Sequence, residues 1–266
     1  MTDSYSERLK FWESRSGLGF AAGSGDINLK KLEINAITKV IGTLTSNSVL
    51  DAGCGNGFTI ASLAETFPDK SFYAFDYSQG MVDSAHLLMR ERGISDRISL
   101  CRASLLDELP AALQSINPPK NGFDCIYTER SLINLDTFDQ QLQAINSLWS
   151  LLAPGGSLVL CEAFHDGLVE INSYREAVGL PHITPPWHNR YLALSELSKL
   201  IRGCSQEPNI VEFSGTYYFI SRIVHAREAS LQGKEPSYEA AINKQAFDLP
   251  SLPMFGQSKI VIWKKP

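Results

Sequence analysis

The chain has 266 residues, of which 44% are hydrophobic and 20% charged, and its formal net charge is −5. This length is sufficient for one α/β domain with a large core. The negative charge, without any long run of Lys or Arg, excludes the basic footprint with which nucleic-acid-binding proteins contact phosphates, so we expect no nucleic-acid partner.

The N-terminus begins without an apolar segment, and no stretch of the sequence reaches the length that a bilayer requires. We therefore expect no membrane partner and a cytoplasmic location. Residues 11–15 contain two aromatic side chains and an arginine, and a glycine-rich run follows at residues 17–25. We predict that residues 1–30 form a lid over the functional site.

Apolar runs rich in β-formers recur at residues 48–51, 71–76, 98–102, 123–128 and 157–162. Between them, stretches that begin near Phe58, Val82 and Phe138 place apolar residues at helical spacing. The third of these helices is expected to end at residues 152–156, directly before the fifth strand. The alternation predicts an α/β fold, a mostly parallel sheet with helices on both faces.

The pattern becomes irregular after the fifth strand. Residues 164–191 mix histidines, prolines and glycines without a clean period, and we interpret them as a cap insertion. Helical spacing returns at residues 194–201, followed by a strand at 210–213. Residues 217–257 form a second predicted cap insertion, with helices near 221–232 and 237–247, before a last strand at 259–263. The chain 1–266 is thus predicted to be a single domain with two caps.

The sharpest motif is a glycine loop that follows the first strand, with Asp51 before it and Gly53, Gly55 and Gly57 within it. Glycine permits positive φ and lets a ligand lie directly on the main chain, at the start of a helix whose amides are unpaired. The dinucleotide fingerprint would require glycine at position 58, where Phe58 stands. The spacing therefore disfavours NAD.

Five further positions lie at or after the ends of the second and third strands. Asp76 ends the second strand, where an acid can accept hydrogen bonds from two ribose hydroxyls. Tyr77 and Met81 come next as packing partners for a ligand. Ser104 and Leu105 follow the third strand, where an adenine edge would be met.

In order and spacing, these motifs resemble those of class I methyltransferases that use S-adenosylmethionine, over roughly residues 45–165. The resemblance implies a Rossmann-like seven-stranded sheet with a reversed final strand. It implies that S-adenosylmethionine is the cofactor and S-adenosylhomocysteine the product, with the glycine loop around the methionine part and Asp76 on the ribose. In the lid, Arg15 would pair with the methionine carboxylate and Trp12 would keep water from the sulfonium. Glu129 is also expected to contact the cofactor.

The residues at the end of the fourth strand indicate the class of acceptor. Amino-group methylases of DNA and glutamine carry Asn/Asp-Pro-Pro-aromatic there, whereas this chain has Tyr127-Thr128-Glu129-Arg130. We therefore expect transfer to an oxygen, less often a nitrogen, of a small polar acceptor such as a sugar or nucleotide sugar, as in the bacterial polysaccharide or secondary-metabolite methyltransferases that the chain resembles. The expected acceptor-binding residues are Arg130, Asn134, Trp187, Asn189, Tyr191, Tyr217, Tyr218 and Arg222.

A hydroxyl acceptor also loses a proton, so a base with a pKa near the working pH is required. His188 meets this requirement if its pKa is unperturbed, and Glu129 is the alternative base or an orienting partner. No cluster has metal-ligand spacing, and the five cysteines include no CxxC pair, so we expect no metal and free thiols. A second hypothesis is an inactive, cofactor-binding partner or scaffold protein, and formation of a homodimer stays open.

Overall fold

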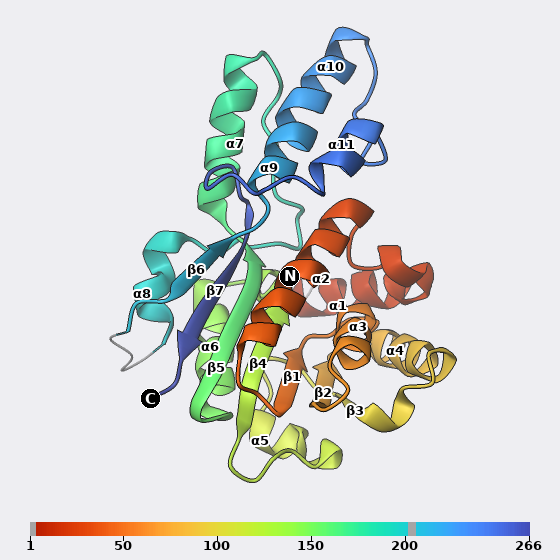
Figure 1. The fold of residues 1–266 in the computed structure, drawn as a ribbon, viewed down its shortest axis with the longest axis vertical. Helices are drawn as coiled ribbons and strands as arrows, with labels where there is room; N and C mark the ends of the chain where they lie inside the picture. The colour runs from red at the N-terminus through yellow and green to blue at the C-terminus, as the bar shows by residue number, and fades with distance from the viewer. Residues whose placement is uncertain (1–3, 202–205) are drawn as a thin grey trace.

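The structure is a computed structural model that describes residues 4–201 and 206–266, so residues 1–3 of the predicted lid lie outside it. Seven strands form one sheet in the order β3-β2-β1-β4-β5-β7-β6 (Figure 1). Their bounds are β1 Ser48–Ala52, β2 Ser71–Asp76, β3 Ile98–Arg102, β4 Phe123–Glu129, β5 Leu152–Ala163, β6 Asn209–Glu212 and β7 Ser258–Lys264.

The pairing confirms the predicted mostly parallel sheet with a reversed final strand. β1 pairs in parallel with both β2 and β4, while β7 runs antiparallel between β5 and β6. The strand order changes direction between β1 and β4, and ligands of open α/β sheets bind at such a switch point. The carboxyl ends of these two strands therefore mark where the functional site should lie.

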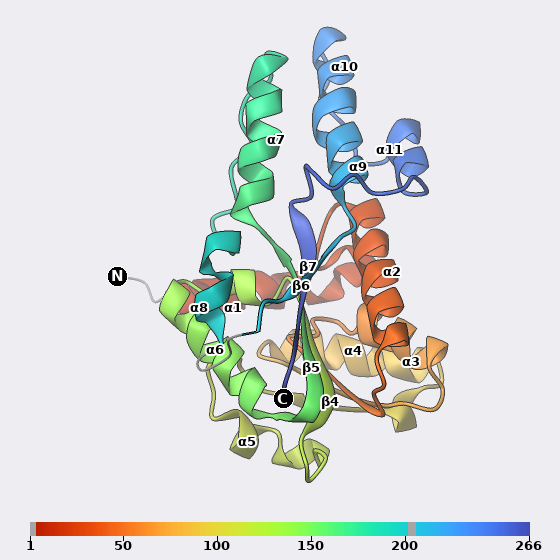
Figure 2. The ribbon, with the colours of Figure 1, turned by 60° about the vertical axis from the view of Figure 1, so that its left-hand side comes forward.

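Helices cover both faces of the sheet, as predicted (Figure 2). One face carries α2 Ile27–Thr43, α3 Phe58–Thr66 and α4 Gln79–Glu91, and the other carries α5 Leu109–Ala112, α6 Phe138–Ser150 and α8 Leu197–Leu200. Successive side chains of β1 enter opposite cores, because Val49 packs with the α2–α3–α4 cluster and Leu50 with the α6 cluster. Both cores are fully buried at the strands that lead to the site.

The predicted end of the third helix at residues 152–156 is wrong. α6 ends at Ser150 and β5 already begins at Leu152, which pairs with Phe123. A Cβ on Gly156 would lie 2.8 Å from the carbonyl oxygen of Phe123, so glycine permits the close approach of the two strands. The segment thus starts a strand because the backbone of β4 lies directly beside it.

Helices from the two segments predicted as caps form a projection beyond the carboxyl end of β5 (Figures 1 and 2). Their role as caps stays a prediction. It consists of α7 His165–Ala177, α9 Gly215–Tyr218, a π-helix at Phe219–Val224, α10 His225–Leu231 and α11 Ala241–Ala246. α7 lies in the segment for which no regular period was visible. Its core face is narrow, with Leu168 and Ile171 buried, and this explains the weak pattern in the sequence.

In the described part of the chain, no helix is long and apolar enough to cross a membrane. The cysteines described by the structure, Cys54, Cys101, Cys125 and Cys161, are free thiols. Cys204 lies outside the described residues.

A buried polar cluster at Asp26 joins the projection to the start of α2. The Asp26 carboxylate accepts hydrogen bonds from the backbone amide of Leu29 at 3.0 Å, from the Tyr217 hydroxyl at 2.6 Å and from the Arg222 guanidinium at 2.7 Å. The guanidinium also stacks 4.5 Å from the ring centroid of Tyr238. One carboxylate thus caps α2 and neutralises a buried arginine of the projection.

Replacing Asp26 should therefore destabilise the protein strongly. Asp26→Ala leaves Arg222 buried without its counter-charge, and we expect a loss of about 3–5 kcal/mol in the free energy of unfolding. Equilibrium urea unfolding followed by circular dichroism measures this change. The control is Asp69→Ala, which alters an exposed turn; a loss no larger than that of the control would contradict the assigned role.

Candidate active site

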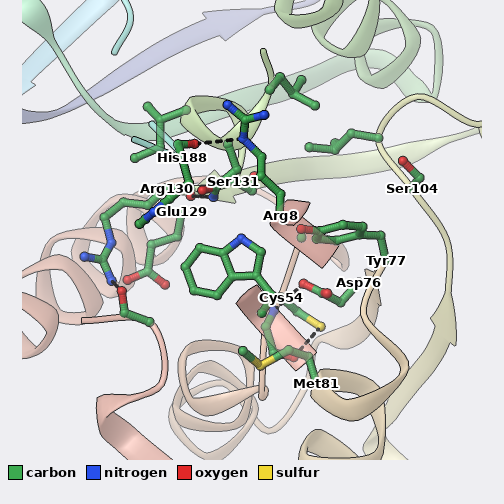
Figure 3. A pocket seen from close by; sticks show the side chains of 18 of the residues that line it. Arg8, Cys54, Asp76, Tyr77, Met81, Ser104, Glu129, Arg130, Ser131 and His188 are labelled. Carbon is green, nitrogen blue, oxygen red and sulfur yellow. Dashed lines mark hydrogen bonds between the residues drawn. The ribbon is translucent and has the colours of Figure 1, made fainter. Parts of the chain in front are cut away.

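Most of the predicted site residues line a single pocket at the carboxyl ends of the parallel strands. Figure 3 shows Asp76, Tyr77 and Met81 on one side of it and Glu129, Arg130 and His188 on the other. The predicted residues that line it are Trp12, Gly53, Gly55, Asp76, Tyr77, Met81, Ser104, Leu105, Glu129, Arg130, Asn134, His188 and Asn189.

The three loop glycines have different tasks, although all have positive φ, with values of 88°, 55° and 81°. A Cβ on Gly53 would lie 2.5 Å from the Cβ of Ser131, and one on Gly57 would lie 2.9 Å from the Cβ of Ala85. A Cβ on Gly55 would meet nothing within 4 Å. Gly53 and Gly57 therefore permit close packing of the loop, and Gly55 leaves the pocket open to a ligand.

Asp51 and Asp76 lie in the two strands next to the glycine loop and have different partners. Asp51 does not line the pocket; it accepts a hydrogen bond from the Tyr127 hydroxyl at 2.5 Å, and burial raises its pKa to about 8. Asp76 does line the pocket and accepts hydrogen bonds from the amides of Gly55 at 2.8 Å and Ser78 at 2.9 Å. Burial raises the pKa of Asp76 to about 6, so it is largely ionised at neutral pH.

Helix α1, Ser4–Arg15, forms the roof of the pocket. Tyr5, Arg8 and Trp12 share one helical face and line the pocket from above. Arg8 forms an ion pair with Asp136 and donates from Nε to the carbonyl oxygen of His188 at 3.1 Å. Arg8 therefore joins α1 to the far wall of the pocket.

The N-terminal region also contacts the opposite side of the pocket, at α4 and the glycine loop. The carboxylate of Glu13 accepts a hydrogen bond from the amide of Gly80 at 3.0 Å, at the start of α4. The Asn56 side chain of the glycine loop donates to the carbonyl oxygen of Gly19 at 2.6 Å. The N-terminal region thus spans the pocket, and its function as a lid stays a prediction.

Arg15, the predicted partner of a ligand carboxylate, does not lie in the pocket. Its guanidinium donates to the carbonyl oxygens of Ala22 at 2.6 Å and Ala21 at 2.9 Å, so it caps the 3-10 turn Ser16–Ala21 that follows α1. The arginine of this helix that lines the pocket is Arg8. Its spacing of four residues from Trp12 was the signal that could have identified it.

Glu129 at the end of β4 is held in a tight ion pair. Its Oε2 accepts from Lys30 Nζ at 2.7 Å and from the Thr59 hydroxyl at 2.5 Å, and Lys30 also donates to Thr59 at 2.8 Å. Burial opposes ionisation of Glu129, but the charges of Lys30 and Arg130 outweigh it and hold its pKa below the ordinary value. A carboxylate so stabilised is a weak base, which argues against the alternative of Glu129 as the catalytic base. No sequence motif had indicated Lys30.

A second ion pair lies next to the first. Arg130 has a positive φ of 50°, and its Nε lies 3.3 Å from the carboxylate of Glu33 in α2. Its guanidinium also donates to the carbonyl oxygen of Gly23 at 3.0 Å. Burial raises the pKa of Glu33 to about 7. Two side chains of α2, Lys30 and Glu33, therefore form ion pairs with the two charged residues at the end of β4, Glu129 and Arg130.

His188 lies in the pocket wall, but its pKa is not unperturbed as assumed from the sequence. Burial, together with the positive charges of Arg8 and Arg15, lowers the pKa of His188 to about 4. The ring packs 4.3 Å from the Phe11 ring, and its Nδ1 is buried without a hydrogen-bond partner among the described residues. The imidazole is thus neutral at physiological pH and can accept a hydrogen bond.

Five expected acceptor-binding residues do not line the pocket: Trp187, Tyr191, Tyr217, Tyr218 and Arg222. Trp187 is 58% exposed and packs its ring edge-on against Phe11. The cluster at Asp26 includes Tyr217, Tyr218 and Arg222, because the helical segment that carries them turns this face towards α2. Within residues 4–201 and 206–266, no group of three or more His, Cys, Asp or Glu side chains could hold a metal ion.

The reversed β7, the glycine loop and the acid that ends β2 define a Rossmann-like fold with a nucleoside pocket. Residues 49–156 match the family described as "Methyltransferase domain". Over these residues the chain is similar to the class I S-adenosylmethionine-dependent methyltransferase superfamily.

Three curated relatives illustrate the range of this family. An uncharacterised protein of Synechococcus sp. is 34% identical over 134 residues, which are 50% of this chain and 29% of that protein. The release factor glutamine methyltransferase of Rhodopirellula baltica is 25% identical over 76% of this chain and 63% of its own length. The malonyl-[acyl-carrier protein] O-methyltransferase of Priestia megaterium is 26% identical over 58% and 51%. The chain therefore spans less than two thirds of each of these relatives.

Solved structures show the same fold. The apo form of the S-adenosylmethionine-dependent methyltransferase SibL superposes with a TM-score of 0.57 at 15% identity, covering 90% of this chain and 56% of that one. A geranyl diphosphate methyltransferase in complex with GPP and sinefungin gives a TM-score of 0.55 at 14% identity, covering 90% and 78%.

S-adenosylmethionine is the cofactor of this superfamily, and the residues present fit it. The open backbone at Gly55 leaves space beside the glycine loop, and Asp76 offers an ionised acceptor for ribose hydroxyls. Tyr77, Met81 and Leu105 offer apolar surface to an adenine ring.

Cofactor binding should weaken in acid because of Asp76. Ribose hydroxyls donate to the ionised carboxylate, so binding favours the deprotonated form and affinity falls as the pH drops through about 6. Calorimetric titration with S-adenosylhomocysteine from about pH 8 to about pH 5 should show up to about a tenfold loss per pH unit below that pKa. Asp76→Asn should bind more weakly at neutral pH and lose this dependence. A pH profile unchanged in the variant would show that another group titrates.

Proposed function

We propose that the protein transfers a methyl group from S-adenosylmethionine to an oxygen of a small polar acceptor such as a sugar or nucleotide sugar, with a nitrogen as the alternative acceptor atom. One observation carries the acceptor part of this proposal. Asn134 Oδ1 and His188 Nδ1 line the pocket, are buried, and have no hydrogen-bond partner among the described residues. Buried acceptors without donors are costly, so they suit a ligand that brings hydroxyl or amine donors.

The pocket residues would assist the transfer mainly by position. When bound, S-adenosylmethionine would supply the methyl group. The acceptor oxygen would form the new C–O bond as the C–S bond breaks. The electron pair of the C–S bond would stay on sulfur, which gives S-adenosylhomocysteine. Asn134 and His188 would orient the acceptor hydroxyl for in-line attack. The neutral imidazole would accept a hydrogen bond from the hydroxyl, whose proton finally passes to solvent.

The end of β4 supports a hydroxyl acceptor over a planar amide. The named relatives include a glutamine methyltransferase and an O-methyltransferase. In place of Asn/Asp-Pro-Pro-aromatic this chain has Glu129 and Arg130, both engaged in ion pairs. Those side chains cannot clamp an amide in the way that the glutamine-specific motif does.

A second candidate is a cofactor-binding protein without turnover, acting as a partner or scaffold. The observation that favours it is the weakness of both predicted bases, since the Glu129 pKa is lowered and the His188 pKa is about 4. Incubation with sugars, polyols and nucleotide sugars, with S-adenosylhomocysteine formation as readout, tests both. Formation of product above the acceptor-free background supports the enzyme, and binding without turnover for every acceptor supports the partner protein.

With an acceptor in hand, His188→Ala should lower the turnover rate by about 10–100-fold, because an unoriented hydroxyl rarely reaches the attacking geometry. Affinity for S-adenosylhomocysteine should stay nearly unchanged. His182→Ala, in the same segment and exposed, serves as the control. Normal turnover of the His188 variant would remove the histidine from the acceptor site.

Removing a contact between α1 and the pocket wall should make the cofactor product dissociate faster. Arg8→Gln removes the ion pair to Asp136, a contact between α1 and the pocket wall. We expect S-adenosylhomocysteine to dissociate about 10-fold faster or more, because charge-assisted bonds of this kind contribute about 1.5–3 kcal/mol. Stopped-flow fluorescence measures the rate, and Lys10→Gln, exposed on the same helix, is the control. Equal rates in both variants would contradict a lid held by Arg8.

A further inference from the structure

We propose that the Lys30–Glu129 ion pair is the binding site for the α-amino acid end of the cofactor, with Glu129 accepting from the ammonium group and Lys30 donating to the carboxylate. This inference rests on the proposed function, since it takes S-adenosylmethionine as the ligand. It assigns to a residue of α2 the role that the sequence had suggested for Arg15.

The first observation is a free oxygen on Glu129. Lys30 and Thr59 occupy Oε2, whereas Oε1 is buried and has no hydrogen-bond partner among the described residues. The side chain is only 6% exposed and lines the pocket. A buried carboxylate oxygen without a donor is unfavourable, and a ligand ammonium would satisfy it.

The second observation is the place of Lys30. Its ammonium has three N–H donors, of which Glu129 and Thr59 take two, and the residue lines the pocket. Thr59 lies in the first turn of α3, directly after the glycine loop, and Gly57 at the N-cap has no side chain that could cap the helix. The remaining N–H and the positive end of a nine-residue helix both favour a carboxylate there.

The other cations near the pocket are already committed. Arg15 binds backbone carbonyls outside it, Arg8 is paired with Asp136, and Arg130 is paired with Glu33. Among the described cations that line the pocket, Lys30 is the one that donates to Thr59, beside the glycine loop. A pair of opposite charges matches a zwitterion better than a phosphate, because a phosphate would be placed against the Glu129 carboxylate.

Two ligands that differ only at the amino acid end test the proposal. S-adenosylhomocysteine carries the zwitterion, and 5′-methylthioadenosine keeps the nucleoside and thioether without it. By calorimetry, Lys30→Gln and Glu129→Gln should each lower the affinity for S-adenosylhomocysteine by about 10–100-fold. The affinity for 5′-methylthioadenosine should fall by less than about twofold. Lys31→Gln, exposed one residue along α2, should change neither affinity.

A double variant keeps the test valid if single variants destabilise the fold by leaving one buried charge. Lys30→Gln combined with Glu129→Gln removes both charges together, and it should show the same selective loss of S-adenosylhomocysteine. An equal loss of both ligands would mean that the pair only shapes the pocket and would overturn the proposal. If Glu129→Gln lowered the affinity for S-adenosylmethionine but not for S-adenosylhomocysteine, the Glu129 carboxylate would lie at the sulfonium. That result would overturn the proposal as well.

The proposed function fails in a different way. Wild-type protein that binds neither nucleoside would overturn the cofactor assignment itself. Unchanged S-adenosylhomocysteine affinity in Lys30→Gln and Glu129→Gln would overturn only the role of the ion pair.

Discussion

The site depends on the close approach of the loop after β1 to the turn after β4. Gly53 lies so near Ser131 that any side chain would collide with it, and the Ser131 hydroxyl donates to the carbonyl oxygen of Ala52 at 2.8 Å. The buried carboxylate of Glu162 holds this turn by accepting from the amides of Ser131 and Leu132. This contact places the glycine loop and the charged end of β4 in the same pocket.

Burying charged side chains at that point requires partners, and α2 supplies them. Lys30 and Glu33 lie about one turn apart on α2 and neutralise Glu129 and Arg130. Because single buried charges are strongly unfavourable, the position of α2 is coupled to the electrostatics of the pocket. The cluster at Asp26 fixes the start of α2 to the helical projection. The projection is thus connected to the pocket through α2, although Tyr217, Tyr218 and Arg222 do not line the pocket.

Sequence patterns predicted the sheet, the glycine loop and Asp76 well because each depends on neighbouring residues in one strand or loop. They failed at α7, whose buried face is too narrow to show a period, and at Arg15, whose side chain returns to its own backbone. They also did not predict the pKa of the candidate base, His188. The pKa of His188 follows from its burial against Phe11 and the charges around it, which no local pattern contains.

By itself, the sequence determined the order of the strands and the position of the glycine loop, since positive-φ glycines and strand ends are local properties. Only the tertiary structure decided which charges meet. Lys30 and Glu129 are 99 residues apart, and Asp26 and Tyr217 are 191 apart. Their pairing arises from the packing of α2 against the sheet and the projection. Desolvation at the same contacts sets which carboxylates stay ionised and leaves His188 neutral.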